Sequence, residues 1–453
     1  MEEYIEKLIS QIRCKKARPY IADEIRNHIE EQIEDNKLNG MTSEEAEKCA
    51  VIDMGDPIDV GVSMDKIHRP RISWKILIVV GILSILGIVI QYSSLNLLNS
   101  KPQINELYQS SVEEFISSII LGFLIMIGIY FIDFTTIARY SKLIGVFIII
   151  SGCLCLTGIC GASAGTYQMI RFGVLRFSLT ALMMFYVPIY GAILYKYRDG
   201  GKLTFFKAIF WMVVPVIMMF MIPNVVGTGI MFISMMVMLS ISLLKGWFKI
   251  KTKRTLVGLW TVFLIIPVGL LFSAYSFHIL QTHQEARIRA FLSASGDEFY
   301  VTTVLRTLCD NVKLVGNTGN DVAGSLSDFN RDYIFSYILN SYGSVFGIGL
   351  VAILALLVMF IFSASLKQKN ELGMMMGFGC GMILLLNILI NILVSIGIFP
   401  QASSFLPFFS LGRSNMVLSY ALIGIVLSIY RYKDVYPKDV IDKVRMDKRL
   451  LIK

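Results

Sequence analysis

The chain has 453 residues, of which 55% are hydrophobic and only 17% are charged, and its net charge is +9. This composition excludes an ordinary soluble globular protein, in which about a quarter of the residues are charged. The positive charge does not predict a nucleic-acid-binding protein either, because no basic face with interleaved aromatic residues accompanies it.

Residues 1–71 are polar and are predicted to form a small cytosolic helical domain. They hold 16 of the 33 acidic residues but only 11 of the 42 basic residues. Pro19 stands at a first-turn position of a helix, Gly40 ends that helix, and Thr42 with Glu45 forms a capping-box pattern for the next one. Isoleucines recur every four residues on one face: Ile21, Ile25, Ile29 and Ile33. The segment resembles the helical prefix domains found before some bacterial permeases, which implies a role in interaction or regulation.

Ten apolar runs follow, and each approaches or exceeds the length of about 17–25 residues that crosses a bilayer as a helix. They cover residues 74–95, 115–132, 143–160, 179–195, 205–222, 227–244, 255–277, 333–365, 373–399 and 414–430. The predicted fold class is therefore an all-α integral membrane protein with about ten transmembrane helices. Cys153, Cys155 and Cys160 lie close together but inside an apolar run without His or carboxylate neighbours, so no metal site is predicted there.

The charges in the loops predict the orientation of these helices. Lys and Arg are concentrated before the first run, in alternate loops and in the basic tail 431–453, which places both termini in the cytosol. The membrane domain is expected to span residues 72–430. One long polar segment, residues 278–332, falls on the outer side between the seventh and eighth helices. Its mixture of basic and acidic residues suits an anionic, lipid-linked substrate.

Two motifs lie on the outer side of this arrangement. The first is LSDFNRDYIFSYILNSYG, from Leu326 to Gly343. The second runs from Asn391 through GIFP, at residues 397–400, to LPFFSLGRS, at residues 406–414. Both resemble signatures of the SEDS family (shape, elongation, division and sporulation), represented by RodA, FtsW and SpoVE. The resemblance covers residues 74–430 and places Asp332 on the essential aspartate of the family.

The resemblance implies a peptidoglycan glycosyltransferase that polymerises lipid II in a bacterial cell membrane. Asp332 would act as the general base. The residues expected to bind substrate are Arg287, Arg289, Arg331, Asn391, Pro400, Pro407, Ser410, Gly412, Arg413 and Ser414. A class B penicillin-binding transpeptidase is the implied partner, besides lipid II and the membrane lipids. The cofactor is left open, with a divalent cation such as Mg²⁺ as the candidate.

Several positions depart from the family pattern. Asn224 replaces an aspartate, Asn340 and Ser341 replace paired glutamates, and Ala181 stands where another glutamate is usual. These changes favour one alternative, a non-catalytic relative that binds lipid II or serves as a scaffold in a cell-wall complex. A transporter or flippase is a second alternative, but it would need ionisable residues within the helices, and the clearest apolar runs hold almost none. From spacing alone, Asp332 could also be a helix-start residue that pairs locally.

Overall fold

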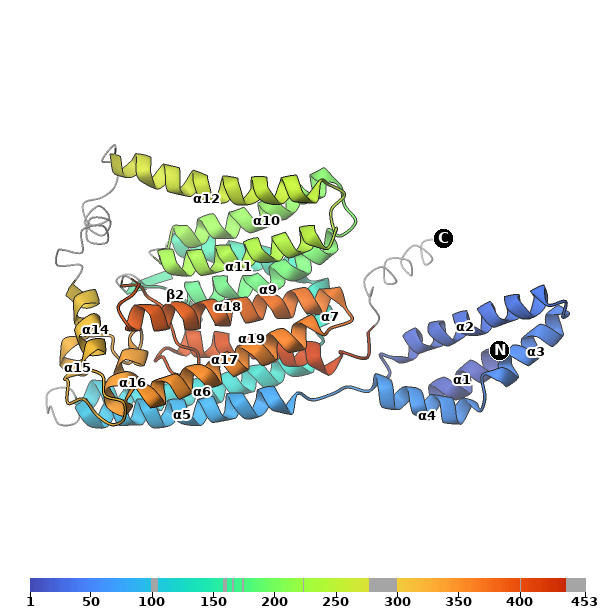
Figure 1. Ribbon diagram of the computed structural model, residues 1–453, viewed down its shortest axis with the longest axis horizontal. Coiled ribbons are helices and arrows are strands. Elements are labelled where there is room, and N and C mark those ends of the chain that lie inside the picture. Colours follow the sequence, from blue (N-terminus) through green and yellow to red (C-terminus); the bar gives the residue numbers. More distant parts are fainter. Residues whose placement is uncertain are drawn as a thin grey trace.

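A computed structural model of the protein describes residues 1–98, 105–157, 161–164, 167–172, 175–222, 224–276, 300–399 and 401–436. Two parts are visible in Figure 1: four short helices at one end, and a bundle of long, roughly parallel helices that makes up the rest. The fold is that of a multi-pass helical membrane protein. Eight helices of the described chain are long and apolar enough to cross a membrane.

The first part consists of α1 (Glu2–Ser10), α2 (Arg18–Leu38), α3 (Ser43–Asp53) and α4 (Pro57–His68), called here the prefix helices. Ile21, Ile25 and Ile29 are buried as the stripe predicts, whereas Ile33 is only partly buried. The capping box is present, since Thr42 accepts from the Glu45 amide and the Glu45 carboxylate accepts from the Thr42 amide.

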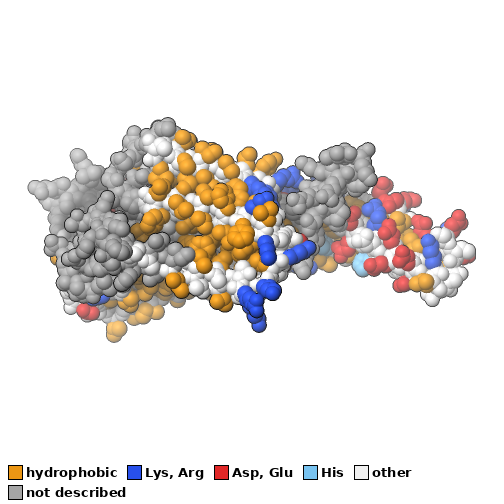
Figure 2. All heavy atoms as spheres, turned by 90° about the horizontal axis from the view of Figure 1, so that it is seen from above, with side chains coloured by type: hydrophobic (Ala, Val, Ile, Leu, Met, Phe, Trp, Pro, Cys, Tyr) orange, Lys and Arg blue, Asp and Glu red, His pale blue; other side chains and the backbone are white. Residues whose placement is uncertain are grey.

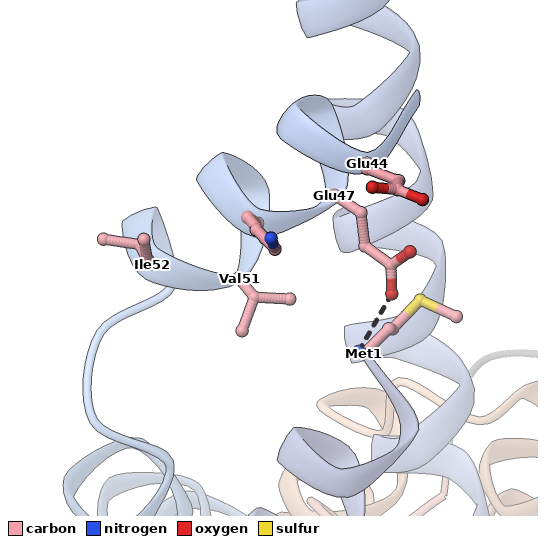
Figure 3. Close-up of a pocket in the computed structure, with 6 residues that line it drawn as sticks. Met1, Glu44, Glu47, Val51 and Ile52 are labelled. Carbon is pink, nitrogen blue, oxygen red and sulfur yellow. Dashed lines mark hydrogen bonds and ion pairs between the residues drawn. The ribbon is translucent and has the colours of Figure 1, made fainter. Parts of the chain in front are cut away.

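A hollow of about 430 Å³ lies beside α3 in the prefix helices (Figure 3). The N-terminal amine of Met1 reaches across it to the carboxylate of Glu47 at 3.1 Å. Val51 and Ile52 contribute apolar lining. This contact joins α1 to α3, so the hollow is part of the packing among the prefix helices.

The eight helices that are long and apolar enough to cross a membrane are α5 (Trp74–Leu98), α6 (Asn105–Phe131), α9 (Leu179–Lys196), α10 (Lys202–Phe220), α11 (Val225–Leu244), α17 (Ser344–Leu366), α18 (Glu371–Ser395) and α19 (Arg413–Arg431). Two further apolar runs form α8 (Ser141–Leu156), which has only 16 residues, and α12 (Thr252–Ser276). Each of the ten runs thus contains a helix, while a count of ten membrane crossings stays a prediction.

Helices α9 and α19 occupy the centre of the bundle. In each, 78% of the most apolar stretch is buried, compared with 33% in α17. Helix α19 packs along α6, and α18 packs against α9 and α17. The central position of α19 matters because its first residues carry polar contacts, which are described below.

The apolar character of residues 333–365 predicts a single helix, but this run does not form one. It is broken at Gly343 into α16 (Ile334–Tyr342) and α17. Gly343 has φ +93°, and a Cβ there would lie 2.7 Å from the Leu314 carbonyl oxygen. The backbone amides of Ser344 and Val345 donate to carbonyls of Lys313 and Leu314, so the preceding loop occupies the space beside the break. Only glycine fits this left-handed, crowded position.

The end of the bundle away from the prefix helices also contains short elements between the long helices. A three-stranded antiparallel sheet is formed by β1 (Gly161–Ala164), β2 (Tyr167–Phe172) and β3 (Leu175–Ser178), with Ile170 opposite Phe177. Helices α14 (Tyr300–Asp310) and α15 (Val322–Ser325) lie in the long segment before α16. This sheet and these two helices were not expected from the sequence.

A polar junction joins the prefix helices to the bundle near α7 (Phe134–Arg139). The Lys16 ammonium contacts the buried Asp133 carboxylate at 2.7 Å, and the Tyr436 hydroxyl donates to the same carboxylate. Burial alone would raise the pKa of Asp133, but the hydrogen bonds from Lys16, Tyr436 and Thr135 outweigh it and hold that pKa below its usual value. Figure 2 shows Lys and Arg side chains gathered at this end of an otherwise hydrophobic surface.

Candidate functional site

Asp332 lies in the connection between α15 and α16, two residues before α16 begins. Its backbone amide donates to the Asp328 carbonyl at 3.0 Å, and the residue is only 8% exposed. The pKa of Asp332 is raised to about 7, chiefly by burial and also by the nearby Asp328 charge. Arg331 and a hydrogen bond with Ser403 act in the opposite direction. A carboxylate with a pKa near 7 is suited to accept a proton at neutral pH.

Asn391 on α18 holds the backbone of Asp332 in place. Its side-chain amide donates to the Asp332 carbonyl at 2.9 Å and to the Ser404 carbonyl at 3.2 Å. Asn391 is fully buried, and its carboxamide oxygen has no hydrogen-bond partner among the described residues. This residue therefore connects the Asp332 segment to the loop that precedes α19.

A second carboxamide, Gln91 on α5, joins the same two segments. Its side-chain amide donates to the Asn330 carbonyl at 2.9 Å and to the Phe409 carbonyl at 2.7 Å. The Leu411 amide also donates to the Asn330 carbonyl, at 2.9 Å. The motif comparison missed Gln91, although a buried amide within the apolar run 74–95 is a signal that could have found it.

The loop that precedes α19, residues 401–412, forms one wall of the site and has an unusual backbone. Phe408 has φ +70°, and the Leu406 amide donates to the Ser410 hydroxyl at 2.7 Å. Pro407 and Ser410 are both buried. The Phe408 carbonyl lies against α5 at Gly87, where a Cβ would come within 2.2 Å of it. Pro407 and Ser410 thus shape the loop and face the protein interior.

The start of α19 lies at the end of this loop. Gly412, with φ +153°, precedes the helix, and the Ser414 hydroxyl accepts from the Ser178 amide at 2.8 Å. Arg413 is 3.7 Å from Glu114 of α6 and is 29% exposed. Ser414 therefore ties α19 to β3, while part of the Arg413 side chain stays exposed.

Three predicted site residues, Arg287, Arg289 and Pro400, lie outside the described residues. The others are brought to one end of the bundle, but in different roles. Asp332 and Asn391 are in direct contact through the Asp332 backbone, and Arg331 acts on the Asp332 charge. The remaining positions belong to the adjoining loop and the start of α19: Pro407, Ser410, Gly412, Arg413 and Ser414.

The residues that depart from the family pattern have structural partners. Asn224 caps α11 by accepting from the Gly227 amide at 2.8 Å. Asn340 accepts hydrogen bonds from Thr318 and Asn320 and so holds the preceding loop against α16. Ala181 is buried in α9.

Within the described part of the chain, no group of three or more His, Cys, Asp or Glu side chains is placed to hold a metal ion. Near Asp332, the carboxylate close enough to influence its charge is that of Asp328. The described side chains therefore supply one buried carboxylate that can take a proton, with the Arg331 cation close enough to act on its charge.

A model of the FtsW/RodA/SpoVE family, described as "Cell cycle protein", matches residues 73–435. The chain belongs to this family. "Probable peptidoglycan glycosyltransferase FtsW" of Enterococcus hirae is 30% identical over 190 residues, which cover 40% of this chain and 48% of the relative. The protein with the same name from Wigglesworthia glossinidia brevipalpis is 25% identical over 327 residues, covering 68% and 80%. The chain spans about half the length of the first curated relatives that it matches.

Two solved structures share the fold. A chain from a peptidoglycan synthase complex superposes with a TM-score of 0.64 at 18% identity, covering 81% of this chain and 98% of that chain. The crystal structure of the rod shape determining protein RodA from Thermus thermophilus has a TM-score of 0.56 at 16% identity, covering 80% and 97%. The family assignment and these superpositions agree on the membrane part of the chain.

Proposed function

We propose that this protein is a peptidoglycan glycosyltransferase that polymerises lipid II, with Asp332 as its general base. The observation that carries the proposal is the environment of Asp332. This carboxylate stands at the position of the family's essential aspartate, is nearly buried, has a pKa raised to about 7, and is held through its backbone by Asn391. An exposed aspartate that only paired locally would need none of these features.

In the proposed reaction, a sugar hydroxyl of one lipid-linked glycan attacks the anomeric carbon of another. The new carbon–oxygen bond forms as the bond from that carbon to the lipid diphosphate breaks. Asp332 takes the proton of the attacking hydroxyl, and the diphosphate leaves with the electron pair of the broken bond. Inversion at the anomeric carbon follows from this single displacement.

Cations would stabilise the departing diphosphate, because a guanidinium can bind phosphate oxygens through two parallel hydrogen bonds. Arg413 is the described candidate on the outer loop, since part of its side chain is exposed beside the start of α19. Arg287 and Arg289 are proposed for the same role. Arg331 is assigned chiefly to the electrostatics of Asp332, whose pKa it lowers.

A scaffold that binds lipid II without polymerising it is the second candidate function. It is favoured by Asn340 and Ser341, which stand where the family has two carboxylates and cannot supply that charge. Asn340 is engaged by Thr318 and Asn320 in holding a loop. Asp332, however, retains the group that the reaction needs, so the enzyme is preferred.

We further propose a bacterial cell membrane as the location, with both termini in the cytosol, a separately folding unit at residues 1–71, and a class B penicillin-binding transpeptidase as partner. The cytosolic placement is supported by the Lys and Arg side chains gathered beside the prefix helices (Figure 2). Reporter fusions at Lys251 and after the C-terminus should then give a cytosolic signal, and a fusion at Gly319 an external one. A cytosolic signal at Gly319 would contradict this orientation.

The enzyme and the scaffold are separated by one experiment. The purified full chain is incubated with lipid II, with and without a class B transpeptidase, and glycan products are resolved by electrophoresis. Polymer from the parent chain and none from Asp332→Ala is the expected result. Lipid II binding without polymer under either condition would support the scaffold.

A further inference from the structure

Four basic side chains at the prefix end of the bundle contact a carboxylate: Lys16, Arg71, Arg198 and Lys245. Lys16 contacts Asp133 at 2.7 Å, and Arg71 contacts Asp434 at 3.1 Å. A third carboxylate, that of Glu371, lies 3.4 Å from the Arg198 guanidinium and 3.2 Å from the Lys245 ammonium. Such pairing is expected where several charges are partly buried, because an unpaired charge is costly to desolvate.

One cluster at this end departs from that pattern. It consists of Arg139 at the end of α7, Lys142 at the start of α8 and Lys196 at the end of α9, called here the α8 basic cluster. No carboxylate in the described part of the chain forms an ion pair with any of the three. Lys142 and Lys196 lie close enough for their like charges to interact. The Lys142 and Lys196 ammonium groups therefore lie near each other without an internal counter-charge.

The cluster is held in place by specific contacts, which distinguishes it from free surface lysines. The Lys196 ammonium donates to the Arg139 carbonyl at 2.7 Å. The Lys142 ammonium lies 4.5 Å from the centre of the Tyr197 ring, and the Tyr197 hydroxyl accepts from the Trp211 indole of α10 at 3.0 Å. Ser141, the residue before Lys142, has a fully buried hydroxyl with no hydrogen-bond partner among the described residues.

The surface beyond the cluster is apolar. On α8, Leu143 is 70% exposed and Phe147 is 60% exposed. On α10, Phe206 and Phe210 are similarly exposed, and the two helices meet where Trp211 approaches Gly145. In a membrane, these side chains would face acyl chains while the cations lie at the level of the headgroups.

We propose that the α8 basic cluster binds the phosphate headgroup of an anionic phospholipid, whose acyl chains lie along α8 and α10. The phosphate supplies the negative charge that the protein does not provide. The apolar surface favours a lipid over a free phosphate ion, because a free ion gains nothing from it. Basic pockets between membrane helices on the cytosolic side bind acidic lipid headgroups by the same physics. This site is separate from Asp332 and does not depend on the proposed polymerase activity.

The test uses the full chain purified in a non-ionic detergent, with its unfolding temperature measured during lipid titration. Phosphatidylglycerol should raise the unfolding temperature in a saturable way, whereas phosphatidylcholine and inorganic phosphate should not. Replacing both lysines in Lys142→Gln/Lys196→Gln should raise the midpoint lipid concentration about 25-fold, since each cation near an anionic headgroup contributes about fivefold in affinity. Lys142→Arg, which keeps the charge, should retain the parent midpoint.

The matched control is Lys251→Gln/Lys253→Gln, which removes two exposed lysines at the start of α12. It should leave the midpoint within about twofold of the parent, because these side chains do not belong to the cluster. Equal midpoints for the cluster variant and the control would overturn the proposal. So would stabilisation by inorganic phosphate equal to that by phosphatidylglycerol, which would assign the site to a free ion. If the double variant does not fold, Lys142→Gln alone should shift the midpoint about fivefold.

Discussion

Gln91→Leu tests whether the α5 carboxamide fixes the two segments that form the site. Leucine has a similar size, so the change removes two donated hydrogen bonds and little packing. The Phe409 carbonyl loses its donor from Gln91, at a cost of about 1–3 kcal/mol for an unsatisfied buried group. The Asn330 carbonyl keeps its bond from the Leu411 amide, so its loss is about 0.5–1.5 kcal/mol. Together these give about 2–4 kcal/mol of local destabilisation.

The assay is hydrogen–deuterium exchange at the Asp332 amide. This amide donates to the Asp328 carbonyl in the segment that Gln91 contacts through Asn330. A loss of about 2 kcal/mol accelerates exchange by local opening about 30-fold. Gln368→Leu is the matched control, because that buried amide, just after α17, donates to the Ala364 carbonyl four residues earlier. The control should leave exchange at Asp332 unchanged. Unchanged exchange at the Asp332 amide in Gln91→Leu would refute the claim that Gln91 fixes the two segments.

Three further changes probe other parts of the structure. Asp328→Asn removes the like charge beside Asp332, so the pKa of Asp332 should fall. The acid limb of the polymerisation pH profile should then move to lower pH, and an unmoved limb would contradict this coupling. Lys16→Met leaves Asp133 buried without its ammonium partner and should lower stability by about 1–2 kcal/mol, a cost that is reduced because Lys16 is about half exposed. Proteolysis at residues 69–73 should become faster, and resistance like that of the parent would contradict this role of Lys16. Gly87→Ala drives a methyl group into a loop carbonyl and should destabilise the chain by about 1–3 kcal/mol in thermal unfolding, so a parent-like transition would speak against that close approach.

The sequence predicted those parts of the fold that depend on local pattern. The capping box at Thr42 and the buried stripe through Ile21 and Ile29 follow from spacing along one helix. Each long apolar run likewise contains a helix, because backbone groups in hydrocarbon must bond within their own segment. The break at Gly343 was missed, since it depends on the Leu314 backbone packing against it from a distant loop.

The site shows the same division between local and distant information. Motif matching found Asp332 and Asn391, and the structure joins them by a hydrogen bond between residues 59 positions apart. Gln91 and Asn330 were not found, because their contacts connect α5 to segments more than 200 residues away. The strands β1–β3 were also missed, as four to six residues without a strong alternating pattern give little signal.

The structure also changes the choice of control for Asp332. Asp328, four residues earlier, is the natural comparison from sequence, yet its charge raises the pKa of Asp332. Replacing it would therefore alter the proposed base. Asp310, an exposed carboxylate at the end of α14, lies in the same segment before α16 and is the better control.

The most direct measurement is the rate of lipid II polymerisation by the purified chain, its Asp332→Asn variant and its Asp310→Asn variant. Asparagine keeps the size of the side chain but cannot accept the proton, so Asp332→Asn should be slower by about 10²–10⁴-fold. Its lipid II binding and thermal unfolding should match those of the parent, and Asp310→Asn should polymerise at the parent rate. A parent-like rate for Asp332→Asn would show that Asp332 is not the base.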